Sequence, residues 1–215
     1  MFGHLYLGSR VGDNVDKEGV NSFSIRKLIF MEDKPLPQCV IPIHKPSLRE
    51  YTFFFASGIL VSIPFALFFE SLVPFSFALL LVTVAPFIEE IAKVFPLFYR
   101  HGETERSLVT LGLLIGLGFG IVEFFEYIFI AGSPIIGSIP HIIFHSSTAT
   151  ITSYGIAKKN PLPYFLIAIG LHVVNNFFAL AADFFSVFVG LLVLIAVYLL
   201  AWRYYHLASK DKIVV

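Results

Sequence analysis

The stretch PFIEEIAKVFP, residues 86–96, places two adjacent carboxylates, Glu89 and Glu90, and an amine, Lys93, inside an otherwise apolar run. An ionised group in hydrocarbon costs a few kcal/mol or more, so such groups usually face the interior of a helix bundle and serve a function. On a helix the two carboxylates point about 100° apart, and Lys93 lies one turn from both. A structural ion pair would therefore account for one carboxylate and leave the other unexplained.

The composition places this run in a membrane protein. Of 215 residues, 57% are apolar and only 14% are charged, and the mean hydropathy is +0.82, far above that of a soluble domain. We predict an all-α, polytopic membrane protein that has the lipid bilayer as its surroundings and no nucleic-acid partner. The single cysteine, Cys39, excludes an intrachain disulfide and a cysteine-based zinc site.

Six apolar runs follow residue 50, each near the roughly 20 residues that a helix needs to cross a bilayer. We predict six transmembrane helices at about 51–69, 73–98, 107–130, 136–157, 161–182 and 184–204. They form one domain, 51–205, followed by a cytoplasmic tail, 206–215. Residues 1–50 are predicted to be a short cytoplasmic segment, irregular or with a small strand pair at 22–25 and 39–43, and no apolar stretch there is typical of a cleaved signal peptide.

The basic residues support this count of spans. Cytoplasmic loops retain Lys and Arg, whereas translocated loops lack them. Fourteen of the fifteen basic residues lie before the first run, in the second and fourth connections, or at the C-terminal end, and the remaining one is Lys93. The first, third and fifth connections have none. We therefore expect a multi-pass protein, of a prokaryotic plasma membrane, with both termini in the cytoplasm.

Polar side chains are confined to the four middle spans. The second span carries the Glu89 stretch, and the next three carry carboxylates, imidazoles and amides, namely Glu123, Glu126, His141, His145, His172, Asn175 and Asn176. The first and sixth spans have no ionisable group in their interiors. Because each buried polar group then finds a partner instead of lipid, the pattern predicts that the four middle helices direct these faces to one site.

Small residues favour close packing of the third span. Gly112, Gly116 and Gly120 repeat at four-residue spacing and precede Glu123. Such spacing allows a close approach of two helices, which places the Glu123 face against a neighbouring helix. Glu126, three residues further on, belongs either to the site or to the outer interface.

The fourth span carries two histidines one turn apart. His141 and His145 can face one direction, as in helical metal-ligand pairs, and a zinc site with the nearby glutamates and His172 is an alternative to a metal-free site. The run HIIFH lacks the glutamate that follows the first histidine of zincin helices, so no cofactor is expected. His141, just after Pro140, is expected at the interface, and His145 is the preferred functional residue.

The fifth span pairs His172 with Asn176, again one turn apart. A histidine can move a proton near neutral pH, and an asparagine amide can stabilise an oxyanion. The other interpretation is that the two side chains only satisfy each other's hydrogen bonds. With no Ser-His-Asp arrangement and no cysteine at depth, the available nucleophile is water, which a glutamate could activate as a general base. The set therefore favours hydrolysis of an amide within the membrane.

Four motifs carry a resemblance to a known family. EExxK at 89–93, FxxxE at 119–123, a histidine-bearing fourth span that ends in TSYG at 152–155, and HxxxN at 172–176 resemble the PrsW family of membrane proteases, part of a superfamily with the CAAX-processing and bacteriocin-processing endopeptidases. The similarity covers about residues 75–180.

The resemblance implies a glutamate-dependent intramembrane endopeptidase that cleaves a membrane protein or lipidated peptide. Glu89 and Glu90 match the paired glutamates, one of which activates water, with Glu90 weakly favoured. Glu123 matches the acid of the second motif, and His145, with His141 in reserve, matches the histidine of the third. His172 and Asn176 match the fourth motif, as proton-transferring and oxyanion-stabilising groups. Lys93 lies where some relatives have arginine, as a helper or structural partner.

Two other functions fit the same residues. A transporter or ion-pathway protein also places glutamate, histidine and asparagine at the membrane midplane, but the two halves of this chain show no internal repeat. A catalytically silent membrane scaffold or chaperone would keep the fold without the hydrolysis.

Overall fold

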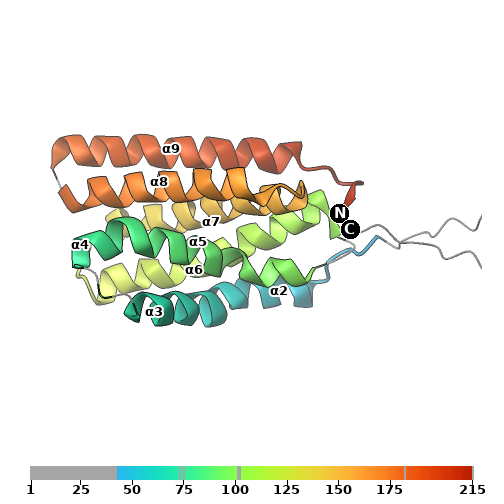
Figure 1. Ribbon diagram of the computed structural model, residues 1–215, viewed down its shortest axis with the longest axis horizontal. Coiled ribbons are helices and arrows are strands. Elements are labelled where there is room, and N and C mark those ends of the chain that lie inside the picture. Colours follow the sequence, from blue (N-terminus) through green and yellow to red (C-terminus); the bar gives the residue numbers. More distant parts are fainter. Residues whose placement is uncertain (1–42, 73, 75, 101–102, 182, 215) are drawn as a thin grey trace, which may run out of the picture. The chain divides into compact units, whose positions relative to one another are not determined.

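The structure is a computed structural model that describes residues 43–72, 74, 76–100, 103–181 and 183–214. The predicted strand pair at 22–25 and 39–43 lies outside these residues, apart from Ile43. Within the described residues the chain is almost entirely helical (Figure 1), which confirms the predicted fold class at that level.

Six continuous helical rods make up the described part of the chain. The first two rods are composite. The first consists of α2 Leu48–Ser57, η1 Gly58–Ser62 and α3 Ile63–Ser71, and the second consists of α4 Phe77–Leu79, η2 Leu80–Val84, α5 Ala85–Val94 and η3 Phe95–Tyr99. The last four rods are single α-helices: α6 Glu105–Phe129, α7 Ile135–Ala157, α8 Pro161–Ala181 and α9 Phe184–Leu207. These bounds differ by at most four residues from the predicted ones.

Four of the rods are long and apolar enough to cross a membrane, judged by length and composition: Leu48–Ser71, Glu105–Phe129, Pro161–Ala181 and Phe184–Leu207. The other two, 77–99 and Ile135–Ala157, hold Glu89, Lys93 and His145. The two rods that hold these polar side chains are therefore the ones whose composition alone does not identify them as membrane spans.

Prolines explain the irregular parts of the first two rods. The π-helical segment η1 ends two residues before Pro64, and η2 ends two residues before Pro86. A proline has no N–H to donate to the preceding turn, and its ring clashes with the carbonyl four residues earlier. The wider π-helical turn accommodates this mismatch, and such turns are frequent at functional sites.

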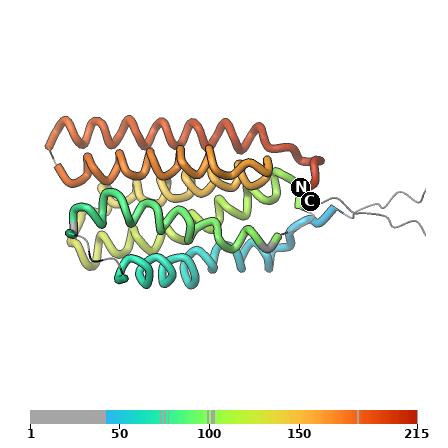
Figure 2. The backbone as a smooth tube through the Cα atoms, in the orientation of Figure 1, coloured from blue at the N-terminus to red at the C-terminus, as the bar shows by residue number. Residues whose placement is uncertain are grey.

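Helix α7 lies at the centre of the bundle and contacts α5, α6, α8 and α9. Figures 1 and 2 both show α6 and α7 running side by side. The glycines of α6 make this contact close. A Cβ at Gly116 would lie 2.7 Å from the Cβ of Ala149, and one at Gly120 would lie 2.8 Å from the Cα of Ile142. The predicted packing of the glycine face against a neighbouring helix is confirmed, and the neighbour is α7.

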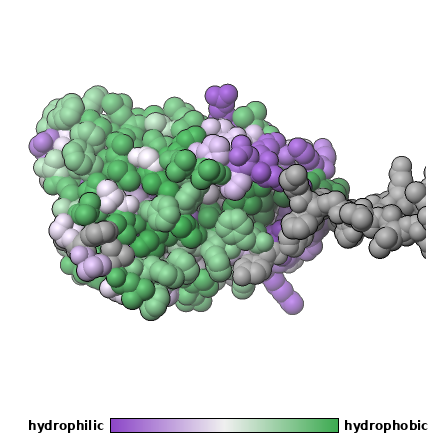
Figure 3. All heavy atoms as spheres, viewed as in Figure 1, coloured by the Kyte–Doolittle hydropathy of each residue, from purple (hydrophilic) through white to green (hydrophobic). Residues whose placement is uncertain are grey.

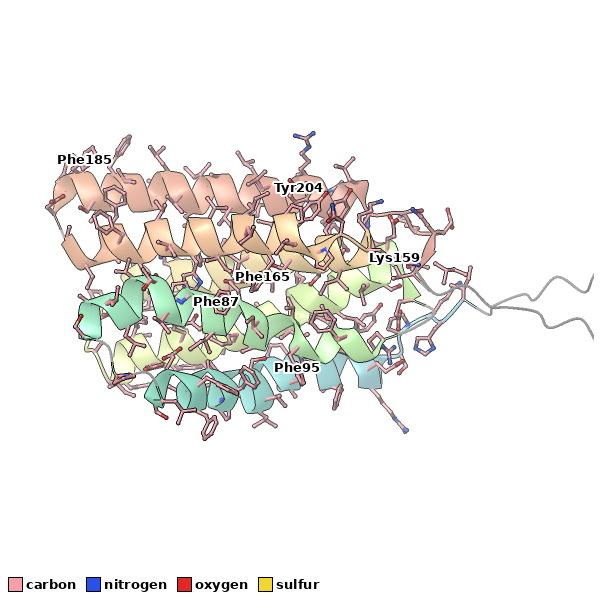
Figure 4. All side chains as sticks on the ribbon, viewed as in Figure 1. Phe87, Phe95, Lys159, Phe165, Phe185 and Tyr204 are labelled. Carbon is pink, nitrogen blue, oxygen red and sulfur yellow. The ribbon has the colours of Figure 1, made fainter. Side chains whose placement is uncertain are left out.

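The two ends of the bundle differ in polarity. In the view of Figure 3 most of the surface is hydrophobic, and hydrophilic atoms gather mainly at the end where α9 finishes. Figure 4 places Lys159 near this end and Phe185 at the opposite end. We refer to these as the lysine end and the phenylalanine end.

The lysine end is held by a partly buried ion pair and a short sheet. Lys158 Nζ donates to Glu105 Oε2 at 2.6 Å, and this hydrogen bond raises the pKa of Lys158. Within the segment expected to be a cytoplasmic tail, residues 206–214 continue α9 to Leu207 and then form β2, Ile213–Val214, which pairs antiparallel with β1, Glu103–Thr104.

Candidate functional site

The ammonium of Lys93 lies at the centre of the site. This side chain is fully buried, and its Nζ donates to Glu90 Oε1 at 2.6 Å, to His145 Nδ1 at 2.8 Å and to Thr148 Oγ1 at 3.3 Å. An ammonium has three donors and no acceptor, so these contacts use its whole capacity. Its charge also lies 5.1 Å from the centre of the Phe119 ring. Lys93 therefore joins α5 to α7 and pairs with Glu90, one of the two carboxylates.

The contact with Lys93 determines the tautomer of His145. Because Lys93 can only donate, His145 Nδ1 accepts, and the ring proton lies on Nε2. His145 Nε2 is in direct contact with Glu123 Oε2, so the proton on Nε2 is donated to that carboxylate. Both ring nitrogens of His145 are thus engaged, one by Lys93 and one by Glu123.

The same argument gives the opposite tautomer for His172, which is also buried. Its Nδ1 lies 3.0 Å from Glu90 Oε1, a carboxylate oxygen that accepts, so Nδ1 carries the proton. Its Nε2 is left with a lone pair and faces Glu89 Oε2 at 3.7 Å. That distance is too long for a direct hydrogen bond. Two acceptors, an imine nitrogen and a carboxylate oxygen, therefore face each other across 3.7 Å.

Glu89 differs from Glu90 in its access to open space. A cavity of about 500 Å³ is lined by Glu89 and Glu123 but not by Glu90. Glu90 is fully buried, whereas the Glu89 side chain is 13% exposed. Glu89 Oε2 is an oxygen without a hydrogen-bond partner among the described residues. Glu90 Oε1 is held by Lys93 and His172, and Glu90 Oε2 also has no hydrogen-bond partner among the described residues. The sequence favoured Glu90 as the base, whereas Glu89 is the one of the two carboxylates that lines the cavity.

The cavity lies toward the phenylalanine end. Its walls come from α3, η2, α5, α6 and α8, and they include Ile130 and Ala131, just after the end of α6, and Leu180, near the end of α8. Glu126 also lines it, so this residue belongs to the cavity and not only to the outer interface. His141 lies beside it, with Nδ1 3.6 Å from Glu123 Oε2 and its ring stacked on Tyr127 at 4.0 Å.

Asn176 is the one predicted site residue that contacts none of the glutamates or histidines of the site among the described residues. Its Nδ2 donates to the backbone oxygen of Leu81 at 3.0 Å, in the π-helical segment η2, and its Oδ1 accepts from Asn175 Nδ2 at 3.3 Å. Leu81 lines the cavity. The amide thus bonds to a residue of the cavity wall, and the alternative interpretation, in which His172 and Asn176 satisfy each other, is not what the contacts show.

Two residues of the site escaped the sequence reasoning. Thr148 accepts from Lys93, and its position one turn after His145 on a polar face was a usable signal. Glu70 lines the cavity but was interpreted as a break between two spans. It is the only ionisable residue between positions 51 and 88, and this isolation in an apolar region could have identified it as a candidate site residue.

Some of these side chains could in principle hold a metal ion. Glu89, His145 and His172 offer ligand atoms within 4.8 Å of one another, as do Glu123, His141 and His145. A divalent ion in the first set would displace Lys93 from His145 Nδ1, and one in the second would replace the proton that joins His145 to Glu123. In the first set only Glu89 Oε2 and His172 Nε2 are ready acceptors among the described residues, one fewer than the three protein ligands of a catalytic zinc site, so this set fits water better than zinc.

Comparison with known proteins adds no identification. The chain matches no family model, no curated protein and no solved structure.

Proposed function

We propose that this protein is an intramembrane endopeptidase that hydrolyses a peptide bond of a membrane protein or lipidated peptide, as its resemblance to the PrsW family implies. The observation that carries the proposal is the pair of unshared acceptors, Glu89 Oε2 and His172 Nε2, which lie 3.7 Å apart, with Glu89 lining the cavity and His172 buried beside it. A water molecule can donate one hydrogen bond to each. No serine, threonine or cysteine nucleophile is needed.

The reaction then follows from these positions. Glu89 takes a proton from the water as its oxygen attacks the carbonyl carbon of the substrate, and the proton passes to the leaving amine as the C–N bond breaks. His172 orients the water through Nε2. Glu90 and Lys93 do not touch the reacting atoms; they hold His172 and His145 in the required tautomers. Asn176 would stabilise the oxyanion only after exchanging its bond to Leu81.

The proposed topology gives the cavity a direction. We propose a prokaryotic plasma membrane as the location and, from the distribution of Lys and Arg, six spans with both termini in the cytoplasm. The lysine end then lies at the cytoplasmic side. The cavity lies toward the other end, so the substrate enters from the outer half of the bilayer.

The test compares the membrane proteomes of cells that express the wild type or Glu89→Gln. Labelling of new N-termini should reveal cleaved peptides that require the wild type and vanish with Glu89→Gln. Asp211→Asn, the same change of carboxylate to amide at an exposed position, is the control and should leave those peptides unchanged. Identical sets of N-termini for wild type and Glu89→Gln, both present in equal amounts, would refute the proposal.

A further inference from the structure

A second cavity, which we call the α9 groove, lies between α6, α7 and α9. Its volume is about 390 Å³, and it shares no lining residue with the glutamate cavity. Leu117, Ile143 and Ala201 contribute apolar side chains to it, and Tyr205 lies toward its lysine end. The predicted function makes no use of this groove.

The groove selects a hydrocarbon. Two of its hydroxyl groups are already satisfied by their own helix, because Ser146 Oγ donates to the backbone oxygen of Ile142 and Thr150 Oγ1 donates to that of Ser146 at 2.7 Å. Such hydroxyls offer a ligand no donor of their own. Apart from the hydroxyls of Ser147, Tyr198 and Tyr205 and the indole of Trp202, the rest of the lining is apolar, and apolar surface favours a hydrocarbon over a polar ligand.

The dimensions of the groove suit a single acyl chain. Along α7 the lining runs from Ile142 to Thr150, a rise of about 12 Å at ~1.5 Å per residue. The volume of about 390 Å³ extends along this length, so the groove is long enough and wide enough for one extended acyl chain.

A cation lies at the lysine end of the groove. The guanidinium carbon of Arg106 lies 4.5 Å from the centre of the Tyr205 ring, which lines the groove. Its Nε and Nη2 donate to the backbone oxygens of His206 and Ala208. Its Nη1 has no hydrogen-bond partner within the described part of the chain, and it is free to bind a phosphate oxygen. Tyr198 and Trp202, also on the groove, are residue types that gather at the headgroup level of membranes.

We propose that the α9 groove binds one acyl chain of an anionic phospholipid, with the phosphate at Arg106. The chain fills the apolar groove and the headgroup lies at the lysine end. This site shares no lining residue with the glutamate cavity, so the lipid-binding proposal can be tested separately from the proposed proteolytic function.

The test uses the full-length protein in detergent micelles and phosphatidylglycerol with a diazirine in a 16-carbon acyl chain. After irradiation, peptide mass spectrometry should find the label on residues 142–150 and 198–205. Ala201→Phe fills the groove and should lower that labelling by more than half. Gly190→Phe, on the same helix where an added Cβ meets nothing within 4 Å, should not.

The headgroup is tested by competition with unlabelled lipid. Arg106→Gln should make phosphatidylglycerol compete about fivefold less well, since a basic residue near a membrane surface contributes about that factor in affinity, and Arg106→Lys should restore most of it. Phosphatidylcholine should compete weakly with all three proteins. Equal labelling over the exposed faces of α8 and α9, labelling unchanged by Ala201→Phe, or crosslinks between two protein copies through the groove would each overturn the proposal.

Discussion

Replacing Lys93 by methionine tests whether the charge network holds the bundle together. Lys93 and Glu90 are both fully buried and 2.6 Å apart. Removing one partner of such a pair leaves an uncompensated charge and costs about 3–5 kcal/mol. For a chain of this size one kcal/mol corresponds to a shift of about 2–4 °C in Tm. Multiplying the free-energy cost by this shift per kcal/mol, we expect Lys93→Met to lower Tm by roughly 6–20 °C.

The double variant separates charge from packing. Replacing both members of a buried pair by neutral groups of similar volume is often nearly neutral, so Lys93→Met with Glu90→Gln should recover most of the lost stability. The measurement is the apparent Tm of the purified protein in detergent, followed by the fluorescence of its single tryptophan, Trp202. Lys210→Met, at an exposed lysine, is the control. A single variant as stable as the wild type, or a double variant no better than the single, would refute the network.

Three further predictions address packing, pH and metal. Gly116→Ala should destabilise by about 1–3 kcal/mol through overpacking against Ala149, whereas Gly170→Ala, with open space around it, should stabilise by up to about 1 kcal/mol; thermal unfolding of both variants decides. Glu105 raises the pKa of Lys158 in the folded state. The pair therefore stabilises the fold below the pKa that Lys158 has in the unfolded chain, and this contribution is lost as the pH rises through its folded pKa. The Tm difference between wild type and Lys158→Met should accordingly shrink above pH ~10.4. Cleavage of a substrate identified by the N-terminus screen should persist in 1,10-phenanthroline, and inhibition that zinc reverses would contradict the metal-free site.

The helices and the convergence of their polar faces could be predicted because both follow from solvation. Apolar runs of about 20 residues have few alternatives to helix in a membrane, and buried groups such as Glu123 and His172 need partners. The glycines of α6 indicated the close contact with a neighbouring helix for the same reason: few other residues fit where two backbones approach.

The partners within the site could not be predicted, because they depend on how each helix is rotated. Periodicity says that Glu89 and Glu90 point about 100° apart but not which of them faces Lys93 and which faces the cavity. That choice comes from tertiary contacts of α5, such as the bond from Ser62 Oγ to the backbone oxygen of Ala92 at 3.0 Å. The pairing of β1 with β2 at the lysine end escaped for a similar reason, since Ile213–Val214 is too short to stand out in the sequence.

The site has two arms that begin at the same ion pair. One runs from Lys93 through His145 to Glu123, and the other runs from Glu90 through His172 toward Glu89. Each arm uses one imidazole in a different tautomer, and the tautomer is determined by the charged group that it contacts. A buried pair of apolar residues would pack as well, but it could not orient either ring. From the sequence alone, the Lys93–Glu90 ion pair would be explained as structural. In the structure, Glu90 fixes the tautomer of His172, and the lone pair of His172 Nε2 therefore faces the carboxylate of Glu89.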